Sequence, residues 1–304
     1  MRNTFVDTVI EFCDVRDDIF IITGDGGFGV LDTFKSIHSN RFLNLGVAEQ
    51  NMASFAAGLA LTGYKVMMYN IIPFVLYRCY EQIRNDICYQ RLPVVLAGIG
   101  SGVTYAPAGM THYSVEDIGI ARTLPNLTVI SPIDPIEAKL AAQYAIEADK
   151  PVYVRLAKRG EPNIHSDERC DITSPCQLTN GKDVAIVFHG SIGVEVLKAR
   201  EILCKYGIEP KLISVPMLQP FNMDQLLPLL NGVRYLVSVE EHYVNSGLGS
   251  LLAGEYAKGS FEWKLVTLGI DDRFIHEIKD AEGMREYYGI SGKKIAGHTK
   301  AIMK

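Results

Sequence analysis

The sequence has little of what disulfide-built, metal-binding or membrane proteins contain. Its six cysteines include no CxxC pair, so neither a disulfide framework nor a zinc site is expected. The net charge is -5 and the Lys and Arg residues are scattered, which provides no basic surface for nucleic acid or an anionic membrane. No apolar run reaches the roughly 18 residues of a membrane span, and Asp7 and Glu11 interrupt the N-terminal segment where a signal peptide is apolar. We therefore expect a cytoplasmic protein that acts on a small molecule.

What is present is an ordinary globular composition with enough chain for two domains. The 304 residues are 48% hydrophobic and 21% charged, which favours sizeable packed cores over disorder. Single domains usually hold about 100 to 200 residues, so two domains are predicted.

The first half of the chain alternates short apolar runs with stretches of helical period. Strands are expected near 18–23, 41–45, 65–69, 93–97, 127–130 and 151–155, and helices near 3–13, 48–61, 74–89, 115–123 and 134–148. This alternation predicts an α/β fold with a mostly parallel sheet covered on both faces.

The second half repeats the alternation on a smaller scale after a polar interruption. Residues 158–182 lose the periodicity and contain two prolines, as an interdomain linker does. Strands are then expected near 183–190, 209–215, 235–241 and 264–270, with helices near 191–206, 223–229 and 247–258. We predict one α/β domain at 1–165, a linker at 166–182 and a second α/β domain at 183–304.

A glycine run, residues 24–29, follows the first expected strand and resembles two cofactor motifs. As GxGxxG it suggests a dinucleotide site, but the ribose-binding acid should then end the second strand, whereas Glu49 opens the following helix. As GDG with a later Asn it suggests a magnesium-diphosphate site, but Asn51 belongs to that helix and not to a loop. Both interpretations are disfavoured, and the run is expected to be a turn.

Glu49 stands at the start of a helix rich in Ala, Gly and Ser, immediately beyond the carboxyl end of a strand. Ligands of open α/β sheets bind at that edge, which favours a ligand-binding role. The alternative is an ordinary helix acid, favoured there by the helix dipole.

Three segments decide between these alternatives. The runs at 44–65, 73–95 and 109–138 resemble, in this order, the pyrimidine-binding domain of transketolases, especially those encoded as two subunits. The resemblance extends over essentially the whole chain and implies a transketolase C-terminal domain in the second half. It implies that Glu49 hydrogen-bonds the aminopyrimidine ring of thiamine diphosphate and thereby favours the tautomer that activates the cofactor.

The resemblance also assigns further residues near the cofactor. Phe74 and Tyr77 have the spacing of two aromatic residues that contact the pyrimidine ring in transketolases, although such a pair at helical spacing is also typical of a core. Asp25 matches an acid near the cofactor.

On the substrate side, His112 matches the histidine of a GxTH segment that faces the substrate, where it can hydrogen-bond or shuttle a proton to a carbonyl oxygen. Arg155 and Arg159 resemble arginines that hold a substrate phosphate.

Three positions depart from, or fit weakly with, the family pattern. Ala108 stands where ordinary transketolases carry an acid that binds a substrate hydroxyl, and a phosphate-holding serine is replaced near Gly29. Arg2 aligns with a phosphate-binding arginine, but its place at the chain end weakens that match. These departures predict a specialised acceptor sugar.

No convincing diphosphate and Mg²⁺ motif stands in this sequence. The resemblance therefore implies a transketolase N-terminal subunit as partner, in an α2β2 heterotetramer that holds thiamine diphosphate between the two chains. The predicted reaction is transfer of a two-carbon ketol unit from a ketose phosphate to an aldose. Two alternatives remain: a thiamine-dependent enzyme that decarboxylates a 2-oxoacid, of the deoxyxylulose phosphate synthase or 2-oxoacid dehydrogenase type, and a non-catalytic regulatory subunit.

Overall fold

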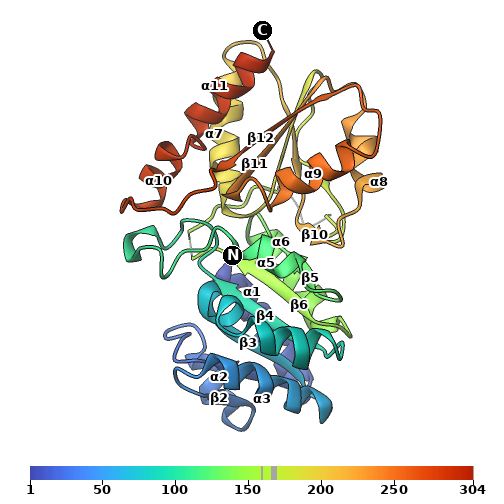
Figure 1. The fold of residues 1–304 in the computed structure, drawn as a ribbon. Coiled ribbons are helices and arrows are strands. Elements are labelled where there is room, and N and C mark those ends of the chain that lie inside the picture. Colours follow the sequence, from blue (N-terminus) through green and yellow to red (C-terminus); the bar gives the residue numbers. More distant parts are fainter. Residues whose placement is uncertain (159, 166–169, 304) are drawn as a thin grey trace.

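The computed structural model describes residues 1–158, 160–165 and 170–303, which form two α/β units stacked end to end (Figure 1). The strands of the first sheet are β1 (Ile19–Thr23), β2 (Phe42–Asn44), β3 (Lys65–Ile71), β4 (Val94–Ile99), β5 (Thr128–Ile130), β6 (Val152–Leu156) and β10 (Met217–Gln219). Their order is β10-β5-β6-β4-β3-β1-β2, and the described pairs are parallel except β10 with β5.

Helices cover both faces of this sheet. One face carries α1 (Arg2–Val15), α2 (Asp32–Ile37) and α6 (Pro135–Glu147). The other carries α3 (Glu49–Leu61), α4 (Tyr80–Gln82) and α5 (Asp117–Arg122). Successive residues of a strand point to opposite faces, so Met67 packs under α1 and α6 while Met68 packs under α3. The alanines of α3 let this helix approach the sheet closely.

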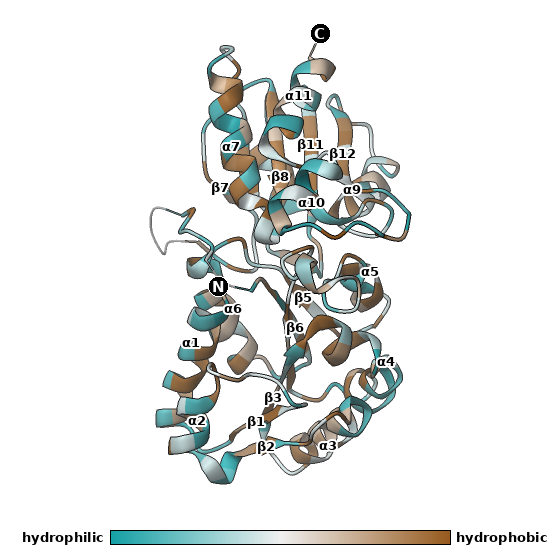
Figure 2. Ribbon diagram, turned by 90° about the vertical axis from the view of Figure 1, so that its left-hand side faces the viewer, coloured by the Kyte–Doolittle hydropathy of each residue, from teal (hydrophilic) through white to brown (hydrophobic). Residues whose placement is uncertain are grey.

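The second sheet has the order β12-β11-β8-β9-β7. Its strands are β7 (Cys176–Gln177), β8 (Val184–Phe188), β9 (Lys211–Ser214), β11 (Tyr235–Tyr243) and β12 (Lys264–Ile270), and its helices are α7 (Gly193–Cys204), α8 (Met223–Leu226), α9 (Leu248–Tyr256), α10 (Ala281–Tyr287) and α11 (Gly292–Ile302). Helices α7 and α11 lie on one face and α9 on the other. The strands of both sheets are mostly apolar, whereas the helices carry both apolar and polar residues (Figure 2).

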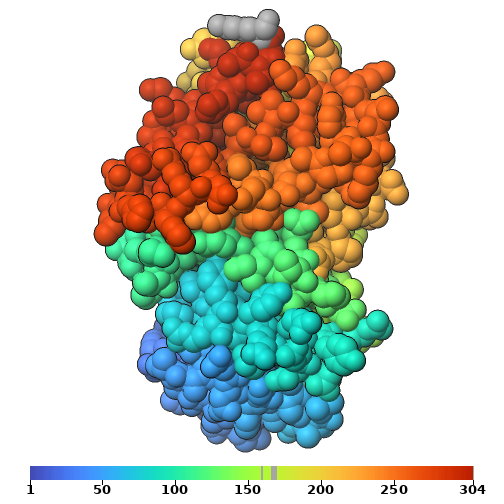
Figure 3. Space-filling view, viewed as in Figure 1, coloured from blue at the N-terminus to red at the C-terminus, as the bar shows by residue number. Residues whose placement is uncertain are grey.

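The two units are joined by one strand and by a common apolar cluster. β10 follows β9 in the chain but pairs with β5, so a segment from the second half forms the edge of the first sheet. A single apolar cluster runs from Met68 through Ile118 to Val187 and Leu248. In the space-filling view the units are in contact over a broad front (Figure 3).

The expected strands and the parallel α/β architecture are confirmed, and three details differ. The helix expected at 74–89 consists of two π-helical turns, Pro73–Tyr77 and Ile83–Cys88, on either side of the short α4. Strand β7 lies inside the expected linker, and α2, β10, α10 and α11 were not expected. No helix in the described part of the chain is both long and apolar enough to cross a bilayer.

Candidate functional site

The candidate site is a pocket of about 520 Å³ at the carboxyl-terminal edge of the first sheet. Parallel strands β1, β3 and β4 all end there, at the edge where open α/β sheets bind ligands. The pocket is lined by Arg2, Gly24, Asp25, Gly26, Gly27, Phe28, Val30, Val47, Glu49, Tyr69, Asn70, Ile71, Phe74, Arg78, Ile99, Tyr105 and His112. It therefore brings together four of the residues expected from the sequence.

Glu49 is the first residue of α3 and is only 3% exposed, although it lines the pocket. The turn before it is held by Asn44, whose Oδ1 accepts hydrogen bonds from the backbone N–H groups of Asp25 and Gly46, both at 2.9 Å. Gly46 has φ +69°, a left-handed conformation that glycine adopts without strain. The chain thereby leaves β2 and presents the Glu49 carboxylate to the cavity.

Arg78 is the partner of that carboxylate. Its Nη1 lies 2.9 Å from Oε2 of Glu49, and its guanidinium carbon lies 4.7 Å from the centre of the Phe74 ring. Phe74 and Arg78 are four residues apart in and just after a π-helical turn, so both side chains leave the same side of the backbone. Turns of this kind occur often at functional sites.

His112 reaches the pocket from the loop between β4 and α5. Its Nδ1 lies 2.8 Å from Oγ1 of Thr111, and its ring centre is 6.0 Å from that of Phe74. Gly109, at φ +80°, turns the chain just before this segment. The cavity thus has an acid, an aromatic face and an imidazole on converging walls.

The glycine run is a turn across the end of β3. Asn70 Nδ2 donates to the carbonyl of Gly24 at 2.8 Å, and Thr23 Oγ1 donates to the carbonyl of Gly26 at 3.0 Å. Asp25, at φ +54°, lies exposed at the pocket wall. Asn51 is exposed in α3 and does not line the cavity, which agrees with the interpretation of the run as a turn.

Tyr77 does not line this pocket, contrary to the expectation that it contacts the ring. Its hydroxyl bonds Ser114 Oγ and donates to Oε2 of Glu116 at 3.1 Å, and burial raises its pKa well above the usual value. The π-helical turn carries it away from Phe74, toward the loop that bears His112. Tyr77, which was expected from its spacing to contact the pyrimidine ring, therefore anchors the loop that bears His112.

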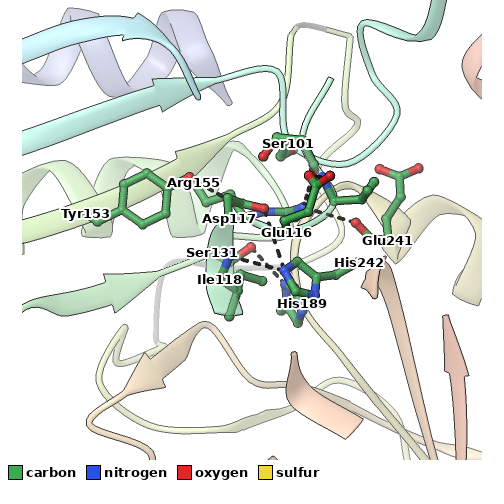
Figure 4. Close-up of polar contacts among 12 residues, drawn as sticks. Ser101, Glu116, Asp117, Ile118, Ser131, Tyr153, Arg155, His189, Glu241 and His242 are labelled. Carbon is green, nitrogen blue, oxygen red and sulfur yellow. Dashed lines mark hydrogen bonds and ion pairs between the residues drawn. The ribbon is translucent and has the colours of Figure 1, made fainter. Parts of the chain in front are cut away.

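Arg155 also lies away from the pocket, so the expectation that it holds a substrate phosphate is wrong. It is 1% exposed, and its Nε donates to Oδ2 of Asp117 at 2.7 Å (Figure 4). Its Nη2 donates to the carbonyls of Ser114 and Glu241 at 3.2 and 3.0 Å. Burial alone would raise the pKa of Asp117, but Arg155 outweighs it and holds that pKa below its usual range. Arg159 lies outside the described residues.

Ala108 and Arg2, the two other residues compared with the family pattern, lie differently with respect to the pocket. Ala108 is exposed in a short helical turn, Ala106–Ala108, and does not line the cavity. Arg2 does line it, at the start of α1. Arg78 was not expected from the sequence, although its spacing of four residues from Phe74 is a signal that places both side chains together.

Two exposed apolar residues stand at the wall of the pocket, beside the exposed Asp25 and Arg78. Phe28 and Val47, which line the pocket, are each 74% exposed. Exposed apolar residues grouped around a cavity are typical of a surface that another chain covers.

Comparison with known proteins gives a consistent result. The family descriptions "Transketolase, pyrimidine binding domain" and "Transketolase, C-terminal domain" match residues 1–162 and 177–295. The chain is 35% identical to one of the subunits of an apulose-4-phosphate transketolase of Actinobacillus succinogenes, over 84% of this chain and 83% of that protein. It is 32% identical to a putative transketolase C-terminal section of Methanocaldococcus jannaschii, over 100% and 96%. A solved structure titled "Split gene transketolase, inactive beta4 tetramer" has a TM-score of 0.86 and 28% identity, over 99% of this chain and 96% of that one.

Proposed function

The chain belongs to the transketolase family, and we propose that it is the C-terminal subunit of a two-component transketolase that depends on thiamine diphosphate. The reaction is transfer of a two-carbon ketol unit from a ketose phosphate to an aldose. The observation that carries the proposal is the buried Glu49 carboxylate, which faces the same cavity as Phe74 and His112.

These residues fit an aminopyrimidine ring. A carboxylate is required beside a ring nitrogen, and Glu49 is held at the wall by Arg78 at 2.9 Å. A planar ring requires an apolar face, which Phe74 provides. When bound, thiamine diphosphate would supply the nucleophilic carbon that carries the two-carbon unit. Glu49 would hold a proton at the ring nitrogen, and Phe74 would orient the ring.

His112 would act on the substrate. Its Nδ1 is engaged with Thr111, so Nε2 is the nitrogen that can exchange a proton with a substrate oxygen. Asp25 and Arg2, which line the same pocket, would contact the polar end of the substrate or cofactor.

The remaining parts are assigned to a partner. The relatives are named as one of several transketolase subunits and as a C-terminal section, which suggests an N-terminal subunit that binds the diphosphate and Mg²⁺. The apolar rim formed by Phe28 and Val47 gives that partner a surface to cover, and an α2β2 assembly would close both sites. Ala108, where an acid is usual, favours a specialised acceptor such as a branched or modified aldose.

The test uses this chain reconstituted with its N-terminal partner. We expect Glu49→Gln to lower turnover with xylulose 5-phosphate as donor by about 10²-fold or more, since a proton-transfer group contributes about 10²- to 10⁴-fold. Glu81→Gln, on an exposed carboxylate of α4, is the matched control and should keep turnover. Full activity of Glu49→Gln would sink the role of this residue.

Two further measurements address the alternatives. Pyruvate replaces the sugar donor and release of CO₂ is measured. Preference for pyruvate would indicate a 2-oxoacid decarboxylase. Failure of the purified pair to bind thiamine diphosphate, measured by calorimetry, would indicate a non-catalytic subunit.

A further inference from the structure

The loop of residues 100–116, which carries His112, lies between the two units. It leaves the end of β4 and is closed at its base, where the backbone N–H of Ser114 donates to the carbonyl of Gly102 at 2.9 Å. In the space-filling view this teal-green segment lies directly beneath the orange and red residues of the second unit (Figure 3). Its position therefore depends on what the second unit presents to it.

The second unit meets the base of the loop through Glu241 on β11, the strand next to the edge strand β12. The residue is 1% exposed, and its carboxylate accepts hydrogen bonds from Ser191 Oγ at 2.6 Å and Arg285 Nε at 2.5 Å. The same carboxylate packs directly on Gly102, so that a Cβ at this position would collide with it. Gly102 has φ +57°, a conformation in which a side chain is strained in any case.

Backbone groups of the same strand complete the contact. The carbonyl of Glu241 and the carbonyl of Ser114 share one donor, Nη2 of Arg155 (Figure 4). Two residues further on, the N–H of Tyr243 donates to the carbonyl of Val115 at 2.9 Å. Both ends of the loop that holds His112 are therefore held by β11.

We propose that Glu241 of the second domain is a positioning residue for His112. Its carboxylate is fixed by Ser191 and Arg285 and packs against Gly102, which determines the position of the base of the loop. The loop in turn determines the position of the His112 imidazole in the pocket. The role of His112 in turnover rests on the proposed function. The link from Glu241 through the loop to His112 rests only on the contacts described above. It gives the second domain a role in the chemistry of the first.

The adjacent carboxylate provides a matched control. Glu240 is equally buried on β11, but its oxygens accept from the N–H groups of Leu248 and Gly249 at the start of α9, both at 2.8 Å. Neighbouring residues of a strand face opposite sides of the sheet. Glu240 also lies 3.6 and 4.0 Å from the imidazoles of His189 and His242. A substitution of Glu240 therefore disturbs the start of α9 and these imidazoles, none of which belongs to the loop of residues 100–116.

The first experiment is a double-mutant cycle in the reconstituted pair. We expect Glu241→Ala to lower kcat by about tenfold, since a misplacement of about 1 Å can cost up to 10²-fold, while KM for thiamine diphosphate stays unchanged. Glu241→Gln, which keeps the contact with Gly102, should retain most of kcat, and Glu240→Ala should stay within about twofold of the unmodified pair. In a His112→Ala background, Glu241→Ala should have no further effect.

The second experiment measures hydrogen exchange of the isolated chain and needs no activity. Glu241→Ala should speed amide exchange in residues 101–116 and leave α3 unchanged, whereas Glu240→Ala should speed exchange in α9. If Glu241→Ala does not fold, Ser191→Ala, which removes one hydrogen bond to the carboxylate, takes its place in both experiments.

An unchanged exchange rate in 101–116, an unchanged kcat, or equal losses in the His112 and His112→Ala backgrounds would each overturn the proposal. Failure of the proposed function would be recognised separately, by full activity of Glu49→Gln with the exchange result intact.

Discussion

Arg78 Nη1 lies 2.9 Å from Oε2 of Glu49, and the same guanidinium covers the ring of Phe74 at 4.7 Å. Arg78 thus contacts both Glu49 and Phe74, the two residues proposed to bind the pyrimidine ring. Arg78 is about half exposed, so the ion pair itself contributes modest stability in the free chain. Its consequence is geometric, because it fixes where the carboxylate points.

We expect Arg78→Met to weaken binding of thiamine diphosphate to the reconstituted pair by about tenfold, the effect of losing one well-oriented charged contact of about 1.5 kcal/mol. Arg78→Lys should recover part of the affinity, because an ammonium keeps the charge but lacks the planar stacking face. Calorimetric titration of the cofactor checks both. Arg84→Met, on a neighbouring turn of the same segment, is the control, and equal losses for Arg78 and Arg84 would contradict the assignment.

Arg155 gives a prediction that separates a structural from a substrate-binding arginine. Arg155→Leu leaves Asp117 buried without its cation, and removal of one partner of a buried pair costs about 3–5 kcal/mol of unfolding free energy. Urea denaturation of the isolated chain measures this loss. Lys158→Met, on an exposed neighbour just past β6, is the control; it removes only a cation–π contact with Tyr105 and should lower the unfolding free energy by at most about 1 kcal/mol. A stable Arg155→Leu chain with a raised KM for the sugar phosphate would restore the phosphate-binding interpretation.

The contrast between Glu49 and Arg155 shows what the sequence can and cannot predict. Strand, turn and helix signals place Glu49 at a sheet edge but leave an ordinary helix acid as the alternative, and the resemblance of three runs to transketolases decides between them. These signals and runs are all local in the sequence. Arg155 also stands at the end of a strand, but its environment is made by Asp117 and by Glu241 from the second domain. No local pattern records a contact between residues 86 positions apart.

The same limit explains the missed elements of the fold. The long alternating runs of the first half predict the parallel sheet because burial on both faces requires apolar residues throughout each strand. β10, by contrast, has three residues and is defined by pairing with β5, far away in the chain. Tyr77 was misplaced because a π-helical turn rotates the residues that follow Phe74, and helical spacing assumes a regular helix.

The pH dependence of the unfolding free energy tests the contact between His165 and Asp134. His165 Nδ1 lies 3.0 Å from Oδ2 of Asp134; burial alone would lower the pKa of His165, but this bond and neighbouring acids raise it to about 10. The folded state therefore holds a proton that the unfolded chain releases near its ordinary value of about 6.5. The contribution of His165 is complete below that value, declines as pH rises, and is lost above about 10.

We expect the unfolding free energy of the isolated chain to decrease between about pH 7 and 10, and His165→Gln to flatten that decrease. Urea midpoints at several pH values measure both slopes. His298→Gln, a histidine on α11 outside this cluster, is the control and should retain the slope. Parallel slopes for the unmodified chain and His165→Gln would show that the imidazole is not the group that holds the proton.

The apolar rim of the pocket predicts how the chain meets its partner. The side chain of Val47 is 74% exposed two residues before Glu49, whereas that of Val15 is 81% exposed at the far end of α1. A carboxylate buried in an interface without a counterion is strongly disfavoured, so Val47→Asp should weaken association with the N-terminal subunit by at least about tenfold. Val15→Asp introduces the same charge on an equally exposed valine and should leave association unchanged. Light scattering after size-exclusion chromatography, over a dilution series of the pair, measures both. If the two variants assemble alike, the partner does not cover the pocket mouth, and the site would have to be completed from another side.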